Sequence, residues 1–211
     1  MRISLVLPLI ALVCLSTAPA TASVLLNTVD GGQYFETRDS GDAILTFVVV
    51  GASNVTIGAF GPYGEMLASG DAKWIILDYS DPTTPVFVSA PVALGAATAP
   101  EFYDIEGLSF TLQANHSYFM GLIANVPFSY GWEFQGFSAV ATAETANGLT
   151  APVGPNGNAT GFDSPAWDGQ GLVQQSIRID DAAVPEPSAI ILLASGLGML
   201  IIRRARASKR S

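Results

Sequence analysis

The chain has 211 residues, of which 18 are acidic and 9 are basic. Residues 23–184 carry 17 acidic and 3 basic side chains, a formal net charge of −14, whereas five of the basic residues fall within 203–211. A domain this acidic repels phosphate backbones, so nucleic acid is excluded as a partner. The single cysteine, Cys14, precedes this domain, which therefore has no disulfide and no thiolate metal site.

Residues 1–22 have the pattern of a secretory signal peptide. Arg2 supplies the positive start, and residues 3–15 form an apolar run that is too short to span a bilayer comfortably. Ala20 and Ala22 fit the small-x-small cleavage pattern, which predicts cleavage after Ala22. A lipoprotein anchor on Cys14 is disfavoured because bulky Val13 precedes it, where a small residue is expected.

Residues 23–181 are predicted to form one all-β domain. Short runs of β-branched and aromatic residues alternate with polar residues and are separated by Gly, Pro, Asn and Asp. About eight such runs favour an antiparallel β-sandwich of the jelly-roll kind. The expected strands are 43–50, 54–60, 73–79, 85–90, 108–113, 118–124, 128–134 and 172–179.

Turns and one long loop are expected between these strands. The sequences at 61–64 and 147–148 contain the Gly, Pro and Asn residues that favour turns. Residues 139–165 are rich in Ala, Thr, Gly, Asn and Pro and have few large apolar side chains, so they are predicted to form a surface loop.

Candidate catalytic residues are few. His116 is the only histidine, and its Asn-His-Ser context is typical of a turn rather than of a nucleophile's base. Pairs drawn from Asp104, Glu106, Glu133 and Glu144 have the chemistry for glycoside hydrolysis, but so acidic a chain gives such pairs by chance. We therefore expect no enzymatic activity, with a secreted glycan-active enzyme as the remote alternative.

Two acidic loops, 78–81 and 163–169, offer oxygen ligands suited to calcium, although neither matches the EF-hand pattern. Solvated turn aspartates are the simpler interpretation, and no other cofactor is expected. Trp74 and Trp132 fall within predicted strands and are assigned to the core. Trp167 falls in a polar loop, where it is the candidate for stacking on a carbohydrate.

The C-terminus combines three features. A Pro-rich stalk at 182–187 ends in Pro185, Glu186 and Pro187, an apolar anchor helix is predicted at 188–202, and a basic tail occupies 203–211. The 14 residues from 189 to 202 cover about 21 Å as a helix, which is less than the roughly 30 Å hydrocarbon core. Arg203, Arg204 and Arg206 fit a cytoplasmic stop-transfer cluster, and Lys209 and Arg210 add two more basic residues to the tail.

This order resembles the PEP-CTERM sorting signal of Gram-negative bacteria: the Pro185-Glu186-Pro187 motif, a short apolar helix and terminal arginines. The resemblance covers about 27 residues. It implies recognition by an exosortase, a membrane processing enzyme, and cleavage near the motif. It also implies transient anchoring in the inner membrane, followed by delivery to the cell surface or the extracellular polymer matrix. An ordinary single-pass anchor with a Pro-rich stalk is the alternative.

The sequence as a whole therefore predicts an exported, surface-sorted protein. Its β domain is expected to be a non-enzymatic structural or interaction component of the cell surface or matrix. The alternative is a carbohydrate-binding module whose partner is extracellular polysaccharide and whose contact is Trp167.

Overall fold

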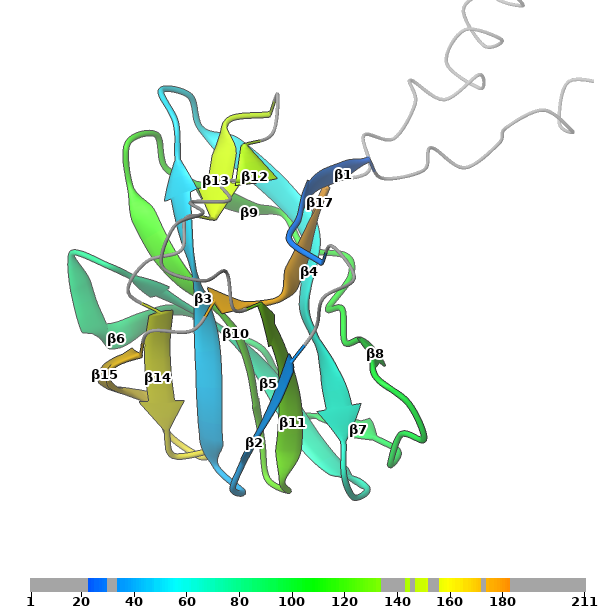
Figure 1. The fold of residues 1–211 in the computed structure, drawn as a ribbon. Helices are drawn as coiled ribbons and strands as arrows, with labels where there is room; N and C mark the ends of the chain where they lie inside the picture. Colours follow the sequence, from blue (N-terminus) through cyan, green and yellow to red (C-terminus); the bar gives the residue numbers. More distant parts are fainter. Residues whose placement is uncertain are drawn as a thin grey trace, which may run out of the picture. The chain divides into compact units, whose positions relative to one another are not determined.

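The computed structural model describes residues 23–29, 34–133, 143–144, 147–151, 156–171 and 174–182. All of the regular structure in these residues is β, and every strand pair in the two sheets is antiparallel (Figure 1). The all-β, antiparallel prediction for the domain is therefore confirmed. None of the described segments is a helix that is long and apolar enough to cross a membrane.

The predicted sorting elements fall outside the described residues. These are the signal peptide with Ala20 and Ala22, the motif at 185–187, the anchor helix at 188–202 and the basic tail with Arg203, Arg204 and Arg206. They stay predictions from sequence.

One sheet has eight strands in the described part of the chain. Its main order is β1-β17-β4-β11-β16, with β2 paired to β11 and with β8 and β9 paired to β4. The strands are β1 (Val24–Asn27), β2 (Tyr34–Arg38), β4 (Val55–Met66), β8 (Glu101–Phe102), β9 (Phe110–Leu112), β11 (Phe128–Glu133), β16 (Gln174–Gln175) and β17 (Ile177–Asp181).

The second sheet has nine strands among the described residues. Its main order is β12-β13-β3-β10-β5-β6, with β14 paired to β3 and β15, and β7 paired to β5. The strands are β3 (Asp42–Val50), β5 (Gly70–Asp78), β6 (Asp81–Val88), β7 (Val92–Leu94), β10 (Ser117–Ala124), β12 (Ala143–Glu144), β13 (Leu149–Ala151), β14 (Asn156–Thr160) and β15 (Ala166–Gly171).

The main core lies between the two sheets. Directly opposed residues of an antiparallel pair share a face, so the pairs Leu122↔Trp74 and Met120↔Ile76 put these side chains on one face of the second sheet. All four are buried, and the indole of Trp74 donates from Nε1 to the Tyr103 carbonyl beside the first sheet at 2.7 Å. Trp74 is thus a core residue, as predicted.

Several boundaries differ from the sequence prediction. The predicted turn at 61–64 is part of β4, which runs without a break from Val55 to Met66. Pro62 has no N–H to donate on this edge of the strand. Its carbonyl accepts from the Tyr103 amide at 3.0 Å, and the Tyr103 carbonyl accepts instead from the Trp74 indole at 2.7 Å. The predicted loop at 139–165 contains β12, β13 and β14, which add to the second sheet through β3.

A smaller apolar cluster lies on the outer face of the second sheet. Phe119 of β10 opposes Phe47 of β3 and Leu77 of β5, so these three side chains share that face. The β14–β15 hairpin supplies Trp167, whose ring centroid lies 4.5 Å from that of Phe119. Phe119 is fully buried as a result, although it points away from the main core.

Candidate functional site

Arg178 of β17 is the centre of a charged cluster on the outer face of the first sheet. Its guanidinium donates to the Asp104 carboxylate, and its Nε lies 3.6 Å from Asp180 Oδ2. Its Cζ also lies 4.6 Å from the centroid of the Phe102 ring, as in a cation–π contact. The exposed fractions of the Arg178, Asp104 and Asp180 side chains are 32%, 11% and 19%, so the cluster is largely desolvated.

Gly61 positions this cluster. Arg178 opposes Gly61 in the β17–β4 register, and the contacts of Arg178 with Phe102 and Asp104 require its side chain to cross β4 at that point. A β-carbon at position 61 would collide with the Tyr103 carbonyl and with the Asp104 Cα. The glycine therefore lets the chain that follows β8 approach β4 closely and places Asp104 within reach of the guanidinium.

Burial raises the pKa of Asp104 above its ordinary value, although the Arg178 charge opposes the shift. The pKa of Asp180 is raised for the same reason, with Glu106 adding a repulsive contribution at both carboxyl groups. Arg178 Nε, Asp104 Oδ1 and Asp180 Oδ1 are buried and have no hydrogen-bond partner among the described residues. Native proteins leave few such atoms unpaired, so these three mark the cluster as unusual.

Three aromatic rings continue from this cluster across the same face; we call Phe35, Tyr63 and Phe102 the aromatic stripe. Tyr63 of β4 opposes Phe102 of β8, with ring centroids 5.2 Å apart, and Phe35 of β2 lies 6.3 Å from Tyr63. Phe35 is 43% exposed, which is high for so large an apolar side chain. The stripe thus presents one exposed ring and two half-buried rings beside charged groups.

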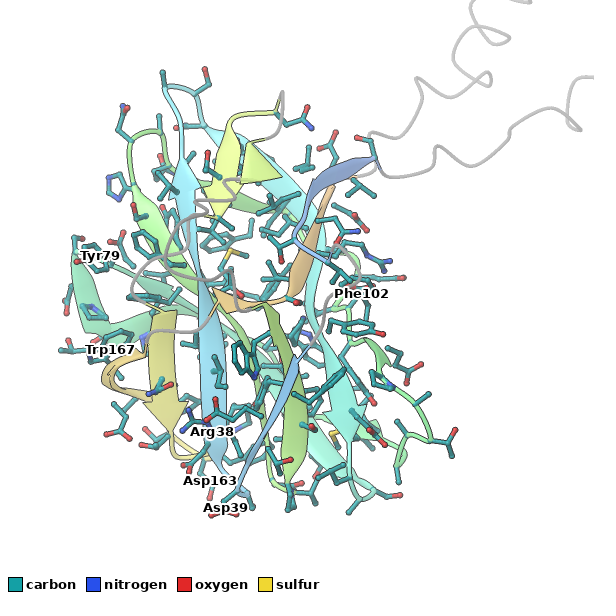
Figure 2. All side chains as sticks on the ribbon, viewed as in Figure 1. Arg38, Asp39, Tyr79, Phe102, Asp163 and Trp167 are labelled. Atoms are coloured by element: carbon teal, nitrogen blue, oxygen red, sulfur yellow. The ribbon has the colours of Figure 1, made fainter. Side chains whose placement is uncertain are left out.

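Trp167, the candidate carbohydrate contact, lies on the other side of the molecule. Figure 2 shows Trp167 and Tyr79 on one side and Phe102 on the other. Trp167 belongs to β15 rather than to a loop, and it is half-buried against Phe119. Its first role in this structure is to cover the outer aromatic cluster, while Tyr79 of that cluster is 44% exposed.

His116 and Asp78 form an exposed pair. His116 Nδ1 lies 3.0 Å from Asp78 Oδ2, and the imidazole stacks on Tyr118. Burial raises the pKa of Asp78, but hydrogen bonds from Ser80 and His116 outweigh it and leave the pKa below its ordinary value. The nearby Ser80 hydroxyl donates to Asp78 Oδ1 and not to the imidazole, so the pair does not have the nucleophile–base–acid order of a catalytic triad.

The loops considered for calcium are organised as turns. Asp78 accepts from the Ser80 amide, and Asp81 accepts from the Thr83 amide and hydroxyl, which is the Asx-turn use of aspartate. Asp163 and Asp168 are exposed. No three metal-ligating side chains gather closely enough to hold an ion anywhere in the described part of the chain. Calcium binding stays a prediction.

Among the four acidic candidates for hydrolysis, the structure places Asp104 against Arg178 and leaves Glu106 exposed nearby. Glu133 and Glu144 lie in β11 and β12, and their side chains are outside the described set. Sequence reasoning named Asp104 but missed Arg178, Asp180 and the aromatic stripe. One signal was present: Arg178 is one of only three basic residues within 23–184.

No protein-family model matches the chain, and no curated protein matches it significantly.

Proposed function

We propose that this chain is a bacterial surface protein of the PEP-CTERM class. Residues 1–22 direct export, and the motif at 185–187 with the apolar helix at 188–202 and the basic tail at 203–211 directs sorting by an exosortase. The observation that carries the proposal is the combination of these features in the right order at the two ends of one chain. A lone Pro-Glu-Pro sequence would be weak support.

The position of the domain ends is compatible with this route. Ser23, the first residue after the expected cleavage site, pairs with Asp181 of β17, and its carbonyl accepts from the Asp181 amide at 2.8 Å. The stalk at 182–187 follows directly. Removal of the signal peptide would thus leave the new N-terminus beside the strand that leads to the sorting motif.

We assign the domain to the jelly-roll class of β-sandwiches. Eight strands taken in chain order are β2, β3, β4, β5, β6, β8, β10 and β11. Numbered one to eight, they give the order 1-8-3-6 in the first sheet and 2-7-4-5 in the second. Consecutive strands thus cross repeatedly between the sheets, as two interleaved Greek keys do, and this order supports the assignment.

The domain's role in this proposal is that of a non-enzymatic structural or interaction component of the cell surface or extracellular polymer matrix. Two observations favour that role over hydrolysis. The Asp78–His116 pair has its serine turned to the carboxylate, and the Asp104 carboxylate is held by Arg178. Both arrangements use the polar groups to hold the structure together.

Mass spectrometry of the two termini of the protein from the producing bacterium tests the sorting proposal. We expect a start near Ser23 and an end near Pro187. A variant with Arg203, Arg204 and Arg206 replaced by alanine should mature incompletely, whereas Tyr79→Ala in the β domain should mature as wild type does. A mature protein that keeps its basic tail, with the same location in the wild type and in a variant lacking residues 188–211, would contradict the proposal.

A further inference from the structure

The aromatic stripe and the Arg178 cluster form one continuous surface on the outer face of the first sheet. Phe102 belongs to both, since its ring lies 5.2 Å from the Tyr63 ring and 4.6 Å from Arg178 Cζ. Phe35 extends the surface at the other end and is 43% exposed. We call these rings, with Arg178, Asp104 and Asp180, the Phe102 surface. It places flat apolar rings directly beside hydrogen-bonding groups.

The polar part of this surface combines buried polar atoms that lack partners with an exposed part of the Arg178 side chain. Asp104 Oδ1 and Asp180 Oδ1 lack donors, and Arg178 Nε lacks an acceptor, among the described residues. The protein itself covers these three atoms, so a ligand rich in hydroxyls would contact the exposed part of the Arg178 side chain, where a hydroxyl can accept a hydrogen bond from the guanidinium. Arg178 keeps 32% of its side chain exposed, which gives such a ligand direct access to the guanidinium.

The local charge narrows the choice of ligand. Asp104 and Asp180 approach the Arg178 guanidinium, and Glu106 is close enough to influence both carboxyl groups. Two carboxylates therefore flank one cation and a third carboxylate acts on both of them, within a domain that is itself strongly acidic. Polymers that carry phosphate, sulfate or carboxylate groups are repelled from such a surface, whereas a neutral polyhydroxylated chain is not.

We propose that the Phe102 surface binds a neutral polysaccharide chain. The apolar faces of successive sugar rings lie on Phe35, Tyr63 and Phe102, and sugar hydroxyls hydrogen-bond to the exposed part of Arg178, which Asp104 and Asp180 hold in place. Aromatic residues and arginine are enriched in protein interfaces whereas carboxylates are depleted, so the carboxylates of Asp104 and Asp180 beside the rings favour a sugar over a protein partner. This proposal deepens the proposed role in the polymer matrix. It rests on that role only in taking an extracellular polysaccharide as the class of ligand.

Affinity electrophoresis of the full-length protein in mild detergent tests the proposal. The gels contain dextran, galactomannan or hydroxyethyl cellulose as neutral probes and alginate as the acidic probe, all at one ionic strength. We expect at least one neutral polymer to retard the wild-type protein and alginate to leave its mobility unchanged. Stronger retardation by alginate than by every neutral polymer overturns the proposal, and so does an absence of retardation by all the probes.

Variants place the site. Phe35→Ala and Tyr63→Ala should each weaken binding by about tenfold, because each removes one stacking ring. The matched control is Tyr79→Ala, which removes an aromatic ring that is 44% exposed on the outer face of the other sheet. It should bind as the wild type does. Because Phe35 is exposed, Phe35→Ala should keep the wild-type unfolding midpoint in urea, which separates lost binding from lost folding.

Three results would assign the surface differently. Loss of binding in Tyr79→Ala together with unchanged binding in Phe35→Ala and Tyr63→Ala would place the site on the Trp167 side and overturn the proposal. A wild-type dimer that Phe35→Asp converts to a monomer, with no polysaccharide bound, would make the surface an interface between two copies. Unchanged polysaccharide affinity in all the variants would also reject the proposal that the Phe102 surface is the binding site. The sorting test reads termini and location, whereas this one reads affinity, so either proposal can fail alone.

Discussion

The carbonyl oxygen of Ser23 accepts a hydrogen bond from the amide of Asp181 at 2.8 Å, and β1 and β17 run side by side (Figure 1). Further along the same pair, Leu26 opposes Ile179, and both side chains are fully buried. The N-terminal strand is therefore part of the core and helps to hold the strand that leads to the predicted stalk. Residues near the expected signal cleavage site should matter for stability as well as for export.

Replacing Leu26 tests this role. Leu26→Ala leaves a cavity at a fully buried position and should lower the free energy of unfolding by about 2–5 kcal/mol. Val24→Ala in the same strand changes a side chain that is 52% exposed and should stay within about 0.5 kcal/mol of wild type. Urea unfolding followed by tryptophan fluorescence measures both. Equal effects would mean that β1 is not anchored through its buried face.

Local pattern was sufficient to predict much of the fold. The alternation of apolar and polar residues and the β-branched side chains predicted β3, β5 and β10 to within a few residues. These central strands are buried on one or both faces along most of their length, so the pattern in the sequence is strong. The pattern failed where tertiary contacts decide. Residues 61–64 have turn composition, yet the pairing with β17 and the close approach of Tyr103 keep them extended within β4.

The candidate site was less predictable for the same reason. Arg178 and Asp104 are 74 positions apart in the sequence, and only the register of β17 on β4 brings them together. Phe35, Tyr63 and Phe102 come from three strands, and no single segment shows them as a group. Composition could have drawn attention to Arg178 as a rare basic residue, but not to its partners.

Gly157 provides a test of the outer aromatic cluster. A β-carbon at this position would collide with the Trp167 ring and would lie 3.1 Å from atoms of Phe119. Gly157→Ala should therefore lower the free energy of unfolding by about 1–3 kcal/mol, the usual cost of overpacking. Gly95→Ala is the matched control, because nothing lies within 4 Å of its added carbon. Thermal unfolding of both variants measures the difference, and a stable Gly157→Ala protein would contradict the close packing of Trp167.

The pH dependence of stability should report on Asp104. Its pKa is raised chiefly by burial, so the folded state binds the proton more tightly than the unfolded state does. Its contribution to stability then falls as pH rises from the ordinary aspartate value, about 3.9, through the raised value. Asp104→Asn cannot titrate at this position, so it should gain stability relative to wild type as the pH is raised from about 4 toward neutral.

Urea unfolding at a series of pH values measures this shift. Asp78→Asn is the control with the opposite sign, because the pKa of Asp78 is lowered in the folded state. The free energy of unfolding of wild type should exceed that of Asp78→Asn near neutral pH, and this difference should shrink as the pH falls below about 4. A difference between wild type and Asp104→Asn that stays constant across the range would show that Asp104 titrates normally.

The hydrogen bond from Trp74 to Tyr103 should connect the core to the Phe102 surface. Trp74 Nε1 donates to the Tyr103 carbonyl at 2.7 Å, and the Tyr103 hydroxyl accepts from the Met66 amide at 3.1 Å, so Tyr103 is fixed at both ends. Its neighbours in sequence are Phe102 and Asp104, which belong to that surface. Trp74→Phe removes the donor, leaves a buried carbonyl unpaired and should lower the free energy of unfolding by about 1–3 kcal/mol.

If the link holds, Trp74→Phe should also weaken binding of the neutral polysaccharide that retards wild type, although Trp74 does not contact the surface itself. Trp167→Phe is the matched control, because it makes the same substitution on the outer face of the second sheet and leaves Tyr103 with its donor. We expect the two variants to differ in polysaccharide binding, measured by affinity electrophoresis, and in the free energy of unfolding, measured in urea. Full binding by a destabilised Trp74→Phe protein would mean that Phe102 and Asp104 are held in place by β4 and Arg178 alone.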